Sequence, residues 1–256
     1  MVMLCESITF EEFKQRADLS EWIVERKYDG IRAYIKHGKI YNRHDKEITK
    51  LFPEFMNDLK SLPVHIAFDA EIVAQSHEFN DISGRIHFKD AFLISLASKK
   101  SPAKLMIFDY YDNIAGNMWS ERRDVLESIK LPVNCELSQA IEGANIEQYW
   151  ADIVVKYSWE GLVAKRKTSK YVWGKRSQDW LKIKAFKETE HKFTKYEVHP
   201  RGVTIEDDEG RRVVVNGAQA KEVVDTFKKT GCAIAQVQYL PQRNGTWRFP
   251  SFRGLK

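Results

Sequence analysis

The chain has 256 residues, 43% of them hydrophobic and 12% aromatic, which is enough apolar material for one large core or two unequal ones. Its net charge of +5 and pI near 8.9 exclude a histone-like protein but suit an anionic partner. Three scattered cysteines without CxxC spacing argue against a disulfide framework or zinc site, and no apolar stretch could span a membrane, so we expect a protein of the reducing cytoplasm without a membrane partner.

The first 187 residues are expected to combine strands and helices. Strand patterns flank a tight turn at Asp29-Gly30 and recur later in the chain. The predicted strands span Trp22–Lys27, Ile31–Lys36, Lys39–Arg43, His65–Val73, Leu105–Tyr110, Gly161–Lys165 and Trp180–Phe186. The predicted helices span Pro53–Leu59, Glu121–Ile129 with Ser120 as N-cap, and Ile146–Tyr157. Residues 83–104 are expected to hold a short helix and an exposed basic loop.

Residues 188–256 are expected to form a second, smaller domain. The charged segment Lys187–Lys195 is interpreted as a linker into a strand near Phe193–His199. Two hairpins follow, around the turns Asp207–Gly210 and Asn244-Gly245. Their strands are predicted at Gly202–Glu206, Arg211–Val215, Ala233–Tyr239 and Thr246–Phe249, and a helix at Ala218–Lys229 ends before Gly231. This pattern is typical of a small five-stranded β-barrel with an OB fold. The predicted class is therefore α+β, with antiparallel sheets and helices in residues 1–187 followed by the barrel.

One short segment carries candidate chemistry. Residues Glu25 to Arg32 fit the pattern E-x-K-x-D-G-x-R, in which Lys27 ends a strand just before the Asp-Gly turn. A lysine in that place can project into a cleft. The alternative for this segment alone is a charged hairpin on a solvated surface.

Further motifs follow in order. Asp69 and Glu71 lie on a predicted buried strand, and Phe108 follows an apolar run. Taken singly, the acidic residues could form an edge-strand ion pair, and Phe108 could belong to the core.

The last motifs lie near the end of the first domain. Glu160 and Lys165 stand at the two ends of one strand, and Lys182 and Lys184 share one face of the next. Taken singly, Lys182 and Lys184 could lie on a solvated face. A single site explains the whole ordered series better than separate coincidences do.

In this order the motifs resemble those of the covalent nucleotidyltransferase superfamily, which includes DNA ligases, RNA ligases and mRNA capping enzymes. The ending Arg248-Phe249-Pro250-Ser251-Phe252-Arg253 resembles the C-terminal motif of ATP-dependent DNA ligases, especially the small phage and bacterial ones. The resemblance implies a nucleotidyltransferase (adenylation) domain at 1–187 and an OB-fold domain at 188–256. It also implies an enzyme that seals 3′-OH/5′-phosphate nicks in duplex DNA, in the cytoplasm of a bacterial or phage-infected cell.

The resemblance assigns roles to these residues. Lys27 would attack the α-phosphate of ATP and become lysyl-AMP, while Lys182 and Lys184 would neutralise charge on that phosphate. Arg248 would orient the leaving pyrophosphate. Phe108 would stack on adenine, and Glu25 would accept a hydrogen bond from its amino group. The full set implied to bind ATP is Glu25, Arg32, Arg43, Glu71, Phe108, Glu160, Lys182 and Lys184.

Metal and DNA are the other implied partners. Glu71 and Glu160 would hold Mg²⁺, for which Mn²⁺ could substitute. We expect a monomer that binds nicked duplex DNA through phosphate contacts, which give affinity without sequence specificity. The alternative is a solvated basic surface. The residues expected to contact DNA are Arg32, Arg43, Lys165, Lys167, Lys170, Lys175 and Arg176.

Three other functions stay open. An RNA ligase would share Lys27 and most of the site, although the OB-like ending favours DNA. A capping guanylyltransferase would use GTP in place of ATP. A nucleic-acid-binding OB module without catalysis would form no lysine adduct.

Overall fold

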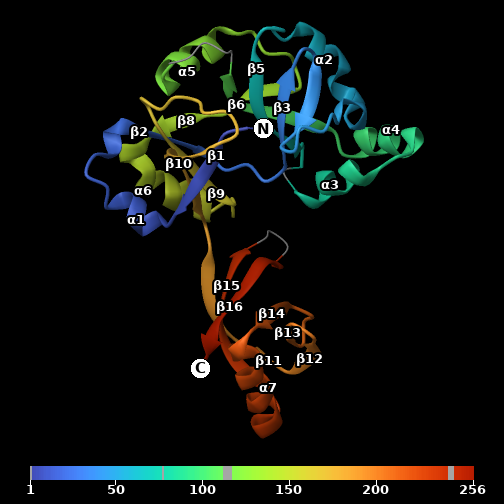
Figure 1. The fold of residues 1–256 in the computed structure, drawn as a ribbon, viewed down its shortest axis with the longest axis vertical. Coiled ribbons are helices and arrows are strands. Elements are labelled where there is room, and N and C mark those ends of the chain that lie inside the picture. The colour runs from blue at the N-terminus through green and yellow to red at the C-terminus, as the bar shows by residue number, and fades with distance from the viewer. Residues whose placement is uncertain (1, 77, 112–116, 242–244) are drawn as a thin grey trace. The chain divides into compact units, whose positions relative to one another are not determined.

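The computed structural model describes residues 2–76, 78–111, 117–241 and 245–256. The chain divides into two compact units (Figure 1). The first comprises Met1–Val154 and Gly161–Ile183, and the second comprises Val155–Glu160 and Lys184–Lys256.

One five-stranded sheet of the first unit has the strand order β1-β10-β9-β2-β8. Its strands are β1 (Leu4–Ile8), β10 (Arg176–Lys184), β9 (Gly161–Arg166), β2 (Trp22–Arg26) and β8 (Ala140–Glu142). Helices α1 (Phe10–Lys14) and α6 (Ile146–Tyr149) lie beside this sheet (Figure 1), and α6 continues as a π-helix over Trp150–Val155. The rings of Phe10 and Trp150 stack at 4.4 Å and join α1 to this helical segment.

A second five-stranded sheet has the order β4-β3-β5-β6-β7. Its strands are β4 (Lys39–Asn42), β3 (Ile31–Lys36), β5 (Ala67–Ala74), β6 (Ala103–Tyr111) and β7 (Cys135–Leu137). The helices around it are α2 (Met56–Ser61), α3 (Asn80–Ser83), α4 (Ala91–Lys100) and α5 (Trp119–Ser128), with 3₁₀ turns at Thr49–Leu51, Pro53–Phe55 and Gly84–His87.

The two faces of the second sheet differ in chemistry because successive side chains of a strand point to opposite sides. One face packs Ala33, Ile35 and Ile40 into the main core, together with Phe55 of a 3₁₀ turn and Leu59 of α2. The other face carries the side chains that alternate with these core residues along the strands. Among them are Arg32 on β3 and Glu71 on β5, which pair in register. The core therefore fixes which side chains the opposite face displays.

Most predicted strands of this unit are confirmed, and three details are corrected. Strand β10 begins at Arg176 rather than Trp180. The N-cap of α5 is Met118, not Ser120, because Glu121 accepts the hydrogen bond of the Met118 N–H at 2.7 Å. Arg85, expected on an exposed basic loop, is buried and paired with Glu54.

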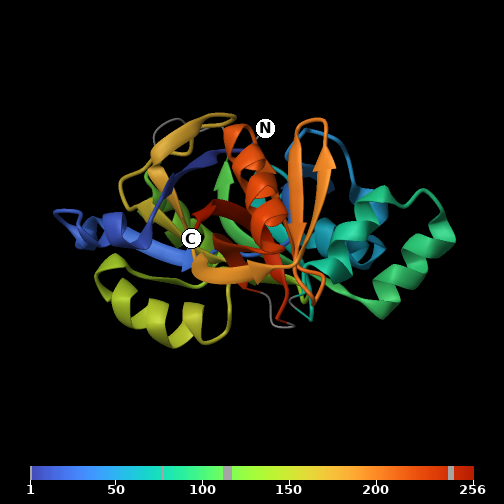
Figure 2. The ribbon, with the colours of Figure 1, turned by 90° about the horizontal axis from the view of Figure 1, so that it is seen from below.

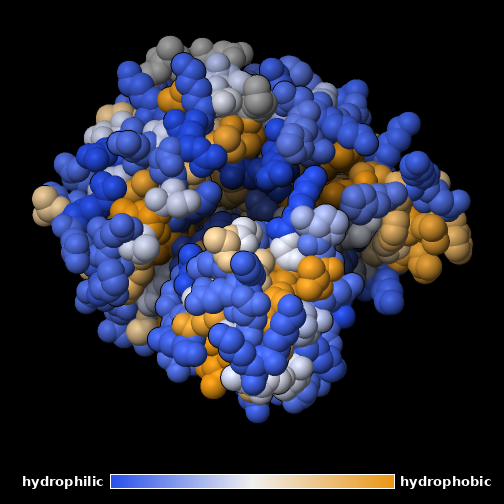
Figure 3. Space-filling model, turned by 60° about the horizontal axis from the view of Figure 1, so that its bottom comes forward, coloured by the Kyte–Doolittle hydropathy of each residue, from blue (hydrophilic) through white to orange (hydrophobic). Residues whose placement is uncertain are grey.

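Helix α4 presents an apolar surface to solvent. Phe92 is 74% exposed, and Leu93 and Leu96 are about half exposed. Figure 3 shows apolar side chains gathered at the edge of the molecule where α4 lies. Only Ile94 of this helix is buried, so α4 contributes little to the core.

No helix in the described part of the chain combines the length and apolar character that crossing a bilayer requires. Cys5, Cys135 and Cys232 are all free thiols.

The second unit holds two three-stranded sheets, β11-β15-β16 and β12-β13-β14. Helix α7 lies beside the hairpin of β13 and β14 (Figure 2). The elements are β11 (Lys187–Phe193), β12 (Lys195–His199), β13 (Gly202–Glu206), β14 (Arg212–Asn216), α7 (Ala218–Thr230), β15 (Ala233–Pro241) and β16 (Trp247–Leu255).

The charged segment interpreted as a linker is strand β11, so that prediction is wrong. Its residues pair in antiparallel register with β15 from Lys187 to Phe193. Only every second side chain, ending in Phe193, turns inward, and the charged ones stay exposed. The prediction of a helix end at Gly231 is confirmed, since its φ is 76° and its N–H donates to Phe227 O at 2.9 Å. The predicted turn at Asn244-Gly245 lies partly outside the described residues.

Asp207 organises the turn between β13 and β14. Its carboxylate accepts hydrogen bonds from the backbone N–H groups of Glu209 and Arg211 at 2.9 and 2.8 Å. It also accepts one from the Arg211 Nε at 2.6 Å and contacts His191 Nε2 at 2.7 Å. Although burial opposes ionisation, the hydrogen bonds from Arg211 and His191 lower the pKa of Asp207 to about 2.

We expect this carboxylate to make the stability of the second unit fall in acid. Because the folded pKa of about 2 lies below the ordinary value of 3.8, the stabilisation is complete above the ordinary value. This stabilisation is lost as the pH falls from the ordinary pKa of the carboxyl group through its folded-state pKa. Urea unfolding between pH 5 and pH 2 would measure this, and Asp207→Asn should remove most of the dependence. The exposed Glu222→Gln on α7 is the control, and an equal loss of pH dependence in both variants would contradict the assignment.

Candidate active site

A pocket of about 250 Å³ opens in the first unit, and both of its five-stranded sheets contribute to the wall. Its size is near the lower end of small-molecule sites. It brings together many of the residues that the sequence singled out. These are Glu25, Lys27, Arg32, Arg43, Glu71, Phe108, Lys165, Arg176 and Lys182. The sequence analysis gave no role to the six other lining residues, although four of them belong to segments that it singled out. The six are Leu4, Cys5, Arg26, Tyr28, Val163 and Trp180.

Lys27 stands at the point where β2 ends and the chain turns toward β3. Its N–H donates to Gly161 O at 2.9 Å, which continues the pairing of β2 with β9 by one residue. Gly30 then lets the turn approach β5, because a Cβ at this position would lie 2.1 Å from Ile72 O. The Asp-Gly turn is thus a packing requirement that fixes where Lys27 enters the pocket.

We expect Gly30→Ala to lower the free energy of unfolding by about 1–3 kcal/mol, because a backbone oxygen must move to admit the methyl group. Gly84→Ala is the matched control, since nothing lies within 4 Å of a Cβ at that position. Urea unfolding of both variants would measure the difference. Equal stabilities would mean that the turn can relax without cost.

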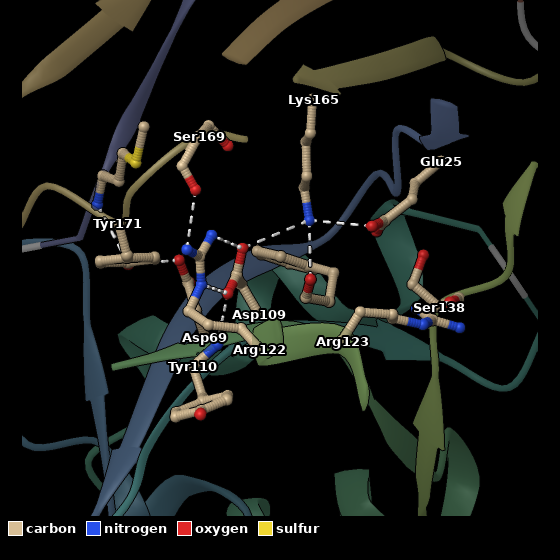
Figure 4. A network of polar contacts seen from close by, with 12 residues as sticks. Glu25, Asp69, Asp109, Tyr110, Arg122, Arg123, Ser138, Lys165, Ser169 and Tyr171 are labelled. Carbon is tan, nitrogen blue, oxygen red and sulfur yellow. Dashed lines mark hydrogen bonds and ion pairs between the residues drawn. The ribbon is translucent and has the colours of Figure 1, made fainter. Parts of the chain in front are cut away.

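Lys165 is the most deeply buried cation of the site, at 1% exposure. Its Nζ contacts Glu25 Oε1 at 2.9 Å and donates to Phe108 O at 2.6 Å (Figure 4). The ammonium also lies 4.5 Å from the Trp180 ring centroid. Burial raises the pKa of the Glu25 carboxyl, and the charge of Lys165 opposes that rise. Glu25 is therefore held at the pocket wall by a residue 140 positions away.

This location corrects the expectation that Lys165 contacts DNA, because a side chain buried in this network is not on the outer surface. The sequence alone could not reveal this, since Lys165 begins a run of basic residues. Lys167 pairs with Glu142 at 2.7 Å. Lys170, Lys175 and Arg176 are exposed.

A second buried ion pair lies behind Lys165. Arg122 on α5 forms a bidentate contact with Asp109 at 2.7 and 3.0 Å, and Asp109 Oδ2 lies 3.8 Å from Lys165 Nζ. Arg122 also donates to the carbonyl oxygen of Ser169 at 2.9 Å (Figure 4) and to that of Asn117 at 2.8 Å. Charges of alternating sign therefore run from α5 to Glu25, and every member has a partner.

Arg32 is fixed in the opposite wall. Its Nε and Nη2 donate to the two oxygens of Asp69, each at 2.7 Å, and its guanidinium lies 4.5 Å from the Phe108 ring centroid. Asp69 also accepts a hydrogen bond from the Tyr171 hydroxyl at 2.6 Å. Burial and the nearby Asp69 carboxylate raise the pKa of Tyr171, so that its hydroxyl stays a donor.

The remaining predicted residues occupy the pocket rim or the second unit. Arg43 and Arg176 are exposed and line the pocket. In the second unit, Lys184 pairs with Glu160 at 3.3 Å. The guanidinium of Arg248 lies 4.7 Å from the ring of Phe249, and burial lowers the pKa of Arg248.

Comparison with known proteins places this chain in a family. The family described as the ATP-dependent DNA ligase domain matches residues 2–184. The chain is 30% identical over 205 residues to the SPbeta prophage-derived DNA ligase-like protein LigB of Bacillus subtilis, covering 76% of this chain and 72% of that protein. It is 26% identical over 287 residues to the bifunctional non-homologous end joining protein LigD of the same organism, covering 93% of this chain and 46% of that protein.

A similar fold is found among solved structures. A Lig E DNA ligase matches over 100% of both chains with a TM-score of 0.72 at 18% identity. The ligase domain of M. tuberculosis LigD matches 100% of this chain and 94% of its own, with a TM-score of 0.58 at 20% identity. These likenesses show a shared fold.

Proposed function

The chain belongs to the family of ATP-dependent DNA ligases, and from that premise we propose that Lys27 is adenylylated when the enzyme seals a 3′-OH/5′-phosphate nick in duplex DNA. The observation that carries this proposal is the pocket itself. Lys27 shares it with four arginines, two further lysines and Glu25, which is paired with Lys165. Such a set can bind a nucleotide and balance the charge of its phosphates.

The reaction consists of three displacements at phosphorus. The neutral Lys27 amine attacks the α-phosphorus of ATP, so that an N–P bond forms, the bond to the bridging oxygen breaks and pyrophosphate leaves. An oxygen of the 5′-phosphate at the nick then attacks the same phosphorus and releases Lys27. Finally, the 3′-hydroxyl attacks the 5′-phosphorus and expels AMP, which closes the strand.

The pocket residues position these reactants. Phe108 would stack on adenine, and its ring centroid lies 4.5 Å from the Arg32 guanidinium and 5.0 Å from the Lys165 ammonium. Glu25 would accept a hydrogen bond from the adenine amino group, which favours ATP over GTP. Arg32 and Arg43 suit the ribose and the 5′-phosphate, because a guanidinium binds phosphate bidentately. Lys182 and Lys184 would neutralise the α-phosphate, and Arg248 would orient pyrophosphate.

The site offers few carboxylates for a divalent metal. Among the described residues, no group of three or more histidine, cysteine or carboxylate side chains comes together. Mg²⁺ is commonly held by one or two carboxylates together with substrate phosphates. Glu71 in the pocket suits that role, and Glu160 is the second candidate. The ion would neutralise phosphate charge when bound.

We also propose that residues 188–256 form an OB-fold domain next to a nucleotidyltransferase domain at 1–187. What supports this is strand connectivity. Only Thr194 separates β11 from β12, which pair with β15 and β13 respectively, so that together they act as one bent strand. Strand β14 lies against β16, and α7 connects β14 to β15. This circular order is that of a five-stranded barrel.

The exposed lysines Lys170 and Lys175 are proposed to contact DNA phosphates, so K170Q/K175Q should weaken binding most at low salt. Each lost contact is expected to reduce the slope of log K against log salt by about 0.9. Anisotropy titrations with a nicked duplex between 50 and 200 mM salt would measure this. K228Q/K229Q, at exposed positions of α7, is the control. An unchanged slope in K170Q/K175Q would mean that these lysines belong to a solvated surface.

The experiment that tests the function is incubation with α-labelled ATP or GTP and Mg²⁺, followed by denaturing electrophoresis and a chase with nicked DNA. Retention of label from ATP, and its discharge as the nick closes, is expected. Label from GTP alone would indicate a capping enzyme, and discharge only on nicked RNA would indicate an RNA ligase. No adduct from either nucleotide would leave a nucleic-acid-binding module. Size-exclusion chromatography would test the expected monomer.

A further inference from the structure

The sheet face that carries Arg32 continues past the pocket into a series of aromatic rings. Tyr34 follows Arg32 by two residues on β3, so both lie on the same face, about 7 Å apart along the strand. Tyr34 pairs in register with Tyr41 on β4, and their rings stack at 5.0 Å with planes 14° apart. Their sequence neighbours Ile35 and Ile40 point into the core on the other face.

The segment between β9 and β10 completes the series. Trp173 lies 5.2 Å from the Tyr34 ring and 5.2 Å from the Tyr111 ring, and Tyr171 lies 5.9 Å from Tyr111. We call these five residues the aromatic row: Tyr34, Tyr41, Tyr111, Tyr171 and Trp173. The row joins two strands of the second sheet, the end of β6 and the connection before β10.

Hydrogen bonds of two tyrosine hydroxyl groups hold the aromatic row in place. The Tyr171 hydroxyl donates to Asp69 and accepts from the Met3 N–H at 3.1 Å. The Tyr34 hydroxyl donates to Asp45 Oδ1 at 3.1 Å. Rings fixed in this way lose little freedom when a flat ligand stacks on them.

Two rings of the row, those of Tyr41 and Trp173, are more exposed to solvent than the aromatic rings of the main core. Phe52, Phe55 and Phe68 in the main core are fully buried, whereas Tyr41 and Trp173 keep part of their surface exposed. Partial exposure leaves aromatic surface on which another planar group can stack.

Cationic residues flank the exposed rings in the sequence, and some of them also line the pocket. Lys170 and Lys175 are exposed on either side of Trp173 in sequence, and Arg43 follows Tyr41 by two residues. Arg43 and Arg176 also line the pocket. The pocket and the segments that carry the row therefore share the cations Arg43 and Arg176, while the exposed carboxylate of Asp45 also lies at the row, against the Tyr34 hydroxyl.

We propose that the aromatic row is a stacking site for an unpaired nucleobase at the strand break. Aromatic rings interleaved with cations are the general means of binding single-stranded nucleic acid, since every base has a face that can stack. This rests on the proposed function, and it extends the substrate from flush nicks to breaks with a flap or frayed terminal base. In a flush nick all bases remain stacked in the duplex and none is available to the row.

The test compares two duplexes that differ only at the break, a flush nick and one with a single unpaired 2-aminopurine at the terminus. The wild-type protein should quench 2-aminopurine fluorescence on binding. Trp173→Leu and Tyr41→Leu should each weaken binding of the flapped duplex by at least about fivefold and change flush-nick binding less than twofold. Trp173→Phe keeps a ring and should retain most of the affinity.

Tyr196→Leu is the control, because Tyr196 is an exposed aromatic residue of β12 outside the row. Equal weakening of both duplexes, or unchanged fluorescence on binding, would overturn the proposal. Thermal unfolding would show whether each variant folds; Tyr41→Leu at the end of the row provides the same test if Trp173→Leu does not. Adduct formation from ATP separates the two proposals, since its loss in the wild type refutes the function whatever the row does.

Discussion

Replacing Lys27 by alanine is expected to abolish formation of the enzyme–AMP adduct and to lower nick sealing by at least about 10³-fold, since the covalent route loses its nucleophile. Lys165 cannot take over this role, because its ammonium is paired with Glu25 and donates to Phe108 O. Electrophoresis after incubation with labelled ATP would measure the adduct. Lys27→Arg should fail equally, because a guanidinium stays protonated and cannot attack phosphorus.

Two controls make this result specific. Lys60→Ala removes an exposed lysine of α2 and should leave the adduct unchanged. A nick that already carries AMP on its 5′-phosphate bypasses the first two displacements, so Lys27→Ala should still close it. Labelled adduct in Lys27→Ala would show that another residue is the nucleophile. Failure to close the adenylylated nick would show that Lys27 has a further role in the last step.

Lys165→Met is expected to destabilise the first unit by about 3–5 kcal/mol, because it leaves the buried carboxylates Glu25 and Asp109 short of a positive charge. Urea unfolding would measure this. The loss should be smaller at pH 5 than at pH 8. An unpaired buried Glu25 has a pKa raised further above its unfolded value, so the protonated form, favoured at low pH, avoids the cost of a buried charge.

The double variant K165M/E25Q separates charge from volume, since it removes both members of the pair. It should recover much of the stability lost in Lys165→Met. A DNA phosphate contact would give a different result. In that case Lys165→Met would change stability by less than about 0.5 kcal/mol, as exposed substitutions usually do, and it would lower the salt dependence of DNA binding. That pattern would contradict the buried pairing.

The sequence by itself located most of the strands along the chain and predicted residues that would carry the chemistry, many of which line one pocket. Alternating apolar residues located β3 at Ile31–Lys36, because the period of two is set by local geometry. The Asp-Gly turn placed Lys27 at the end of a strand. Gly231 ended α7 at the expected place, since a left-handed cap needs only local information.

Only the tertiary structure decided the environment of each charge. Lys165 and Lys170 look alike in sequence, yet one is buried against Glu25 and the other is exposed. The difference arises because β9 lies beside β2 in the sheet, which brings residues 140 positions apart into contact. Strand β11 was missed for the same reason, as its charged residues become a strand only by pairing with β15. Local pattern fixes backbone conformation, whereas solvation of a charge depends on neighbours that only the sheet order supplies.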